Sequence, residues 1–156
     1  MNDVYIHYGH AQFNPMLFKP IQNYETPFTK PRGGLWASRT NAEYGWKDWC
    51  EREGYAECRE SNSFRFTLKE NANVLKINTV DDLKDLPKIK SQFSCLPMWV
   101  LLDYEKLLSE GYDAIEATIY NNGDLYYALY GWDCDSILIM NPAVIESCIE
   151  RMVIAV

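Results

Sequence analysis

The sequence lacks the features of a membrane or secreted protein. No uninterrupted apolar run approaches about 18 residues, the length that a membrane-spanning helix needs. The first ten residues, MNDVYIHYGH, have neither the basic start nor the apolar stretch of a secretory signal peptide. We therefore expect no membrane partner and a cytoplasmic location.

Paired cysteines are also missing. Their number is odd and no two stand in a C-x-x-C pair, so the sequence predicts neither a disulfide framework nor a tetrahedral zinc site. Single scattered cysteines are typical of the reducing cytosol. The five cysteines are Cys50, Cys58, Cys95, Cys134 and Cys148.

Positive charge is scarce. The chain carries 15 Lys and Arg against 22 Asp and Glu, a net charge of −7. Non-specific binding to nucleic acid or to an acidic membrane needs basic patches, so nucleic acid is not favoured as a partner. A local basic pocket, supplied by the stretch Lys30-Pro31-Arg32, is not excluded.

There is no P-loop, no G-x-G-x-x-G and no G-x-S-x-G nucleophile elbow.

What the chain does have is the size of one domain and many aromatic side chains. A length of 156 residues with 47% hydrophobic residues suits a single domain, residues 1–156, with a sizeable core. Apolar patterns predict strands at residues 4–8, 35–38, 63–69, 74–77, 113–120 and 136–140. Capping signals predict helices at residues 41–53, 79–86 and 103–110, and prolines predict a loop at residues 11–33. The mixture indicates an α+β fold, in which short strands form two small packed sheets with a few short helices.

The helix at residues 41–53 carries most of a dense aromatic patch. Its T-N-A-E start, with Thr40 as cap, is a capping box. Trp46 and Trp49 fall on its apolar face, so we expect both in the core. Trp36, in the preceding strand, and Tyr44, in the first helical turn, lie off that face and are placed to border a cleft.

The two histidines, His7 and His10, are the chain's only ones and have H-x-x-H spacing. A strand points them to opposite faces unless the chain turns at Gly9, so we expect a buried histidine rather than a metal ligand. No metal site is predicted. A Cys–His pair in space stays open, without any supporting spacing.

Three carboxylates adjoin apolar strands. Glu116 lies within one strand, and Asp133 and Asp135 stand just before another. Each either faces water at its strand or is held inside a cleft, and the sequence alone favours the first interpretation.

Three separated segments together resemble a known family. The segment IHYG is similar to the opening histidine-glycine motif of the ADP-ribosyltransferases, in the diphtheria-toxin and poly(ADP-ribose) polymerase branch. The segment GGLWASRTNAEYGW resembles that branch's second motif, and CDSILIMNPAVI its last, in which an acidic residue opens an apolar strand. The segments occur in the family's order, although Tyr8 separates His7 from Gly9, which are usually adjacent.

This resemblance implies a compact ADP-ribosyltransferase-like fold that binds NAD as a substrate in a cleft between two small sheets. The nicotinamide ring, a flat cation, would lie between two aromatic faces, Trp36 and Tyr44, with Trp46 as the alternative to Tyr44. His7 would bind the adenosine-side ribose. The remaining cofactor-binding positions would be Gly9, Gly34 and Ser38.

The resemblance also implies a catalytic carboxylate that stabilises an oxocarbenium-like transition state. The family's glutamate aligns with Asp135, and Glu116 is the fallback. The sequence therefore predicts a mono-ADP-ribosyltransferase-like enzyme with a macromolecular acceptor, expected to be a protein. The alternative is a non-catalytic module on the same scaffold that binds NAD or a protein. An unrelated thiol hydrolase, using Cys50 or Cys134, is the third possibility.

Overall fold

The computed structural model describes residues 2–24, 29–90 and 99–149, apart from the side chain of Ser147. Within these residues seven strands form one sheet, in the order β4-β5-β6-β2-β1-β3-β7. Only β4 and β5 run parallel, and the other neighbouring strands are antiparallel. The strands are β1 (Val4–Tyr8), β2 (Leu35–Arg39), β3 (Ser63–Leu68), β4 (Val74–Ile77), β5 (Ala114–Ala117), β6 (Ser136–Ile139) and β7 (Ile145–Ile149).

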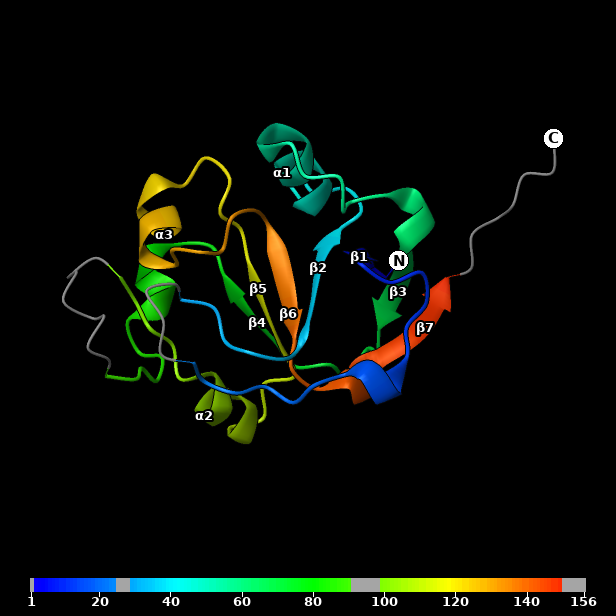
Figure 1. Ribbon diagram of the computed structural model, residues 1–156. Coiled ribbons are helices and arrows are strands. Elements are labelled where there is room, and N and C mark those ends of the chain that lie inside the picture. The colour runs from blue at the N-terminus through cyan, green and yellow to red at the C-terminus, as the bar shows by residue number, and fades with distance from the viewer. Residues whose placement is uncertain (1, 25–28, 91–98, 150–156) are drawn as a thin grey trace, which may run out of the picture.

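Strand β2 joins two groups of strands, as Figure 1 shows. Its first residues, from Leu35 to Ala37, pair with β6, whereas its last two, Ser38 and Arg39, pair with β1. The sheet is therefore continuous, which corrects the expectation of two separate sheets. The mixed α+β character, with a few short helices, is confirmed.

Strand β6 lies between two apolar clusters. Its four residues, SILI, are all buried, as expected of a strand covered on both faces. Leu138 belongs to a cluster with Leu125 and Trp132, and its neighbours Ile137 and Ile139 belong to the other cluster. The continuous apolar run that predicted this strand thus reflects core on both sides.

Helix α1 (Trp46–Glu53) begins five residues after the predicted start at Asn41, which is a correction. Thr40 to Gly45 instead form turns, and the Asp48 carboxylate accepts a hydrogen bond from the Gly45 N–H at 2.9 Å. Gly45 is buried against Ser38, and a Cβ at Gly45 would lie 3.0 Å from that of Ser38. A tertiary contact, rather than the T-N-A-E signal, therefore decides where the helix begins.

The other helices are short. Helices α2 (Tyr104–Ser109) and α3 (Gly123–Ala128) are each capped by a side chain, Asp103 and Asn122 respectively. The short 3₁₀ helices are η1 (Pro15–Leu17), η2 (Glu60–Asn62), η3 (Val80–Leu83) and η4 (Pro142–Val144). No helix in the described ranges is both long and apolar enough to cross a membrane.

Gly34 immediately precedes β2, so a substitution at Gly34 tests the packing around that strand. Its φ is +73°, and an added Cβ would lie 2.6 Å from Leu138 Cδ1. Gly34→Ala should lower the free energy of unfolding by about 3–4 kcal/mol, because left-handed strain of about 1–2 kcal/mol adds to overpacking. The control is Gly54→Ala, with a similar φ of +76° and no atom within 4 Å of the new Cβ. It should cost only about 1–2 kcal/mol in urea denaturation, and equal losses would contradict the packing described.

Candidate functional site

A pocket of about 400 Å³ lies among residues of β1, β2 and α1. We call it the tryptophan pocket, because three tryptophans form much of its wall. Its lining residues include His7, Lys30, Trp36, Trp46, Trp49 and Tyr55.

The aromatic rings of this pocket meet mostly edge to face. The Trp36 and Trp46 ring centroids are 6.4 Å apart with an 80° angle between planes, and Trp46 meets Trp49 in a similar way. Tyr55 stacks on Trp49 at 5.2 Å. A flat ligand can therefore stack on one ring and meet the edge of the next. Trp46 and Trp49 are half-buried in this wall rather than in the core, which corrects the sequence interpretation.

Lys30 brings a positive charge onto two of these rings. Its Nζ lies 5.1 Å from the centroid of Trp36 and 4.7 Å from that of Trp46. The same atom is 3.4 Å from Asp133 Oδ2. Burial lowers the pKa of the Lys30 amine, while the Asp133 carboxylate opposes that shift. The pocket is thus built to hold a cation by cation–π and ionic interactions.

His7 has a defined tautomer when it is neutral. Its Nδ1 lies 2.7 Å from the carbonyl oxygen of Trp36, which can only accept, so Nδ1 carries the proton. Its Nε2 is then an acceptor, and it lies 3.0 Å from Nδ1 of His10. Burial lowers the pKa of His7 and thereby favours the neutral ring. The imidazole therefore offers an acceptor nitrogen at the edge of the pocket.

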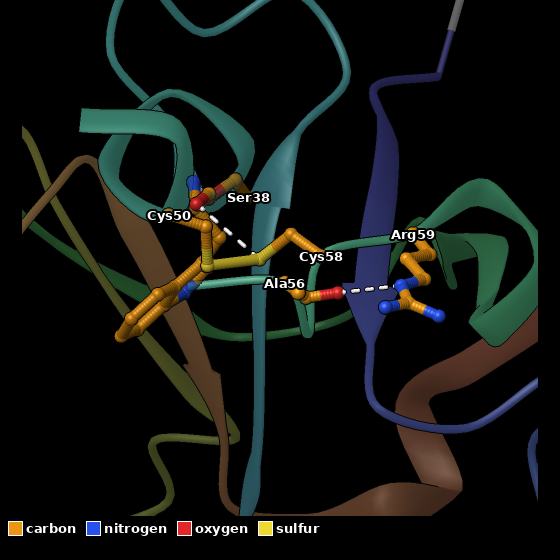
Figure 2. Close-up of a disulfide and its surroundings, with 6 residues drawn as sticks. Ser38, Cys50, Ala56, Cys58 and Arg59 are labelled. Atoms are coloured by element: carbon orange, nitrogen blue, oxygen red, sulfur yellow. Dashed lines mark hydrogen bonds between the residues drawn. A yellow bond between two sulfur atoms is a disulfide. The ribbon is translucent and has the colours of Figure 1, made fainter. Parts of the chain in front are cut away.

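A disulfide forms part of the pocket wall. It joins Cys50, on α1, to Cys58, in the segment after the helix (Figure 2), and both residues line the pocket. Arg59 Nε also donates to the carbonyl of Ala56 at 2.9 Å. The sequence predicted no disulfide, so this pair is a correction. Cys134 is a free, buried thiol.

Tyr44 does not face Trp36 across the pocket. Its ring stacks on Tyr120, with centroids 5.4 Å apart, in a second pocket. Trp46, the alternative to Tyr44, is the pocket residue whose ring meets Trp36, which also contacts the buried Trp132. The late start of α1 explains why Trp46 rather than Tyr44 lies at the pocket, because it leaves Tyr44 in a turn and puts Trp46 at the first helical position.

The remaining predicted cofactor-binding residues have structural contacts. Ser38 is buried, donates to the carbonyl of Asp135 at 2.8 Å and accepts from the Trp46 N–H at 3.0 Å. Gly34 packs against β6, as described above. Gly9, with φ +117°, makes the turn that returns His10 to His7. None of these three residues is among those that line the tryptophan pocket.

Both predicted catalytic carboxylates are engaged elsewhere. Asp135 Oδ1 accepts from the N–H groups of Ile119 and Tyr120 at 2.7 and 2.9 Å. Glu116 accepts two 2.8 Å hydrogen bonds from the Arg39 guanidinium. The carboxylate that reaches a charged group of the pocket is Asp133, which the sequence marked beside its strand but did not assign to the site.

In the described ranges, no cluster of three or more His, Cys, Asp or Glu side chains could hold a metal ion. Trp46 Nε1 is buried without a hydrogen-bond partner there.

The chain matches no protein-family model, curated protein or solved structure.

His7 should make stability depend on pH. Its pKa in the folded protein is below the usual 6.5, so the unfolded chain binds a proton that the folded chain does not. The contribution of His7 to the free energy of unfolding should therefore be fully present above pH 6.5. It should be lost as the pH drops below that value. His7→Gln should flatten this fall in urea denaturation between about pH 7.5 and 5. An unchanged slope would show that His7 is not the buried neutral histidine described.

Proposed function

We propose that this protein binds NAD in the tryptophan pocket and is a mono-ADP-ribosyltransferase-like enzyme that transfers ADP-ribose to a protein. The carrying observation is the Lys30 ammonium group, which lies over Trp36 and Trp46 beside His7. The nicotinamide ring of NAD is itself a flat cation. A pair of rings that already holds a positive charge is suited to it.

In this proposal, the ring stacks on Trp46 or Trp36 and takes the place of the Lys30 ammonium. Neutral His7 offers Nε2 as the acceptor for a ribose hydroxyl once His10 gives way. The buried Trp46 N–H would gain a partner if the ligand reached it, and an unpaired buried donor costs about 1–3 kcal/mol. In this proposal, the seven-stranded sheet belongs to an ADP-ribosyltransferase-like fold with its NAD cleft beside β1 and β2.

Asp133 is the carboxylate that we assign to catalysis. The bond between nicotinamide and ribose breaks with its electron pair on the leaving nitrogen, and positive charge develops on the ribose. A carboxylate held beside that carbon stabilises the charge. Of the three carboxylates that adjoin apolar strands, Asp133 is the best placed, since it pairs with Lys30 at the pocket, whereas Asp135 and Glu116 bind other groups.

The second candidate is a non-catalytic module that binds NAD or a protein. It is favoured by the engagement of Asp135 with two backbone N–H groups and of Glu116 with Arg39. Binding of NAD without release of nicotinamide would support it. No binding of NAD would contradict both candidates.

Two substitutions should change NAD affinity in opposite directions. Trp46→Ala removes a stacking face and should weaken binding about tenfold, the loss expected from about 1.4 kcal/mol of aromatic and cation–π contact. Lys30→Gln removes the competing cation and should tighten binding severalfold. Isothermal titration calorimetry measures both, with Tyr127→Ala, an exposed aromatic outside the pocket, as control. Weaker binding in the Lys30 variant would contradict displacement of the lysine by the ring.

Asp133→Asn should separate catalysis from binding. We expect nicotinamide release to fall about 100-fold, as when one transition-state group is removed, with NAD affinity changed less than about threefold. Asp135→Ala should instead lower the melting temperature, because two backbone N–H groups lose their acceptor. Normal turnover in the Asp133 variant, with loss in folded Asp135→Ala, would overturn the assignment.

A further inference from the structure

A second pocket, of about 420 Å³, adjoins the tryptophan pocket. We call it the tyrosine pocket. Trp49 lines both pockets, and Asp133, in the wall of the tyrosine pocket, pairs with Lys30 of the tryptophan pocket. The lining of the tyrosine pocket includes Tyr44, Arg52, Glu53, Tyr120, Tyr126 and Asp133.

From its aromatic and acidic wall we propose that the tyrosine pocket binds the guanidinium group of an arginine side chain, the acceptor on a protein substrate. The inference rests on the proposed function, because it places this acceptor beside NAD in the tryptophan pocket. A guanidinium group is planar, stacks on aromatic faces and bonds carboxylates with two parallel N–H groups.

The wall combines these two kinds of partner. Tyr120 and Tyr126 are 43% and 36% exposed, so their surfaces are available to a ligand. The pKa of Tyr126 is raised by burial first and by the Asp133 carboxylate next, with a smaller contribution from Glu53. Asp133 and Glu53 line the same pocket as this aromatic ring, and carboxylates beside an aromatic face are the combination that recognises a flat cation.

The chain's own Arg52 already sits in this wall. Its Nε is 4.0 Å from Glu53 Oε1, and its side chain is 74% exposed. The Tyr44 hydroxyl is buried and makes no hydrogen bond of standard geometry in the described residues, yet it is close enough to raise the pKa of Arg52. Since Arg52 is so exposed, it can move aside, and an incoming guanidinium would meet the same tyrosine and carboxylate.

The transfer step balances without any further reactant. The bond from the ribose anomeric carbon to the nicotinamide nitrogen breaks, and its electron pair leaves with neutral nicotinamide. A guanidino nitrogen of the acceptor forms the new bond to that carbon. The proton that this nitrogen loses passes to the Asp133 carboxylate and then to water, and nothing is oxidised or reduced.

The test uses Nα-acetyl-L-arginine amide as the probe, added to the full chain without NAD. Nuclear magnetic resonance titration should give a Kd on the order of 1 mM. Nα-acetyl-L-lysine amide should bind at least about fivefold more weakly, because an ammonium group neither stacks nor forms a bidentate pair. Glu53→Gln should weaken binding of the arginine probe roughly tenfold, the effect of losing about 1.4 kcal/mol. Glu110→Gln, at an exposed glutamate that does not line the pocket, is the matched control and should leave that Kd unchanged.

Equal affinity for the two probes, or an arginine affinity that Glu53→Gln does not change, would overturn the guanidinium site. Addition of NAD then separates the two proposals. Mass spectrometry should find ADP-ribose on the arginine probe and none on the lysine probe. Release of nicotinamide without any modified arginine would overturn the acceptor inference alone. Glu53-dependent probe binding with no cleavage of NAD would keep the guanidinium site and overturn the proposed enzyme.

Discussion

The hydroxyl group of Ser38 holds together the three elements on which the candidate site depends. It donates to the carbonyl of Asp135, just before β6, and accepts from the N–H of Trp46 at the start of α1. Ser38 and Trp36 are two residues apart on β2, so their side chains lie on the same face of the sheet. The bond to Ser38 therefore carries α1 to that face and brings the Trp46 ring to Trp36. With Gly45 packed against it, this buried serine shapes the pocket without lining it.

The charge inside the tryptophan pocket is opposite in sign to the net charge of the whole chain. The protein carries a net charge of −7, yet the tryptophan pocket contains an ammonium group on aromatic faces. Asp133 neutralises that ammonium from the side of the tyrosine pocket. A cationic ligand can thus replace Lys30 and still meet a negative charge, since the half-buried Asp133 carboxylate stays. Exchange of one cation for another is the favoured route, because it keeps a counter-charge beside the carboxylate.

Much of the sheet could be predicted because its signals are local. The apolar patterns predicted β1 and β4 with their observed bounds. The start of α1 could not be predicted, because Gly45 and Ser38 meet only in the folded chain and override a local capping signal. Because of that same contact, Trp46 lies at the pocket in place of the predicted Tyr44. The sequence indicated Lys30 only as part of a possible basic pocket and did not place it with the tryptophans, because it comes from a proline-rich loop and no spacing relates it to either ring. Strand β7, with the mixed pattern IESCI, has too little alternation to be recognised.

The most direct test of this account is the environment of the Lys30 side chain in solution. Aromatic ring currents shift nearby protons upfield, so the ε-methylene protons of Lys30 should resonate upfield of those of the other lysines in the free protein. Addition of NAD should return them toward the values of exposed lysines, as the nicotinamide ring takes the place of the ammonium. Lys30 protons that coincide with the other lysines in the free protein would contradict the cation site. An upfield shift that saturating NAD leaves unchanged would contradict its use for the dinucleotide.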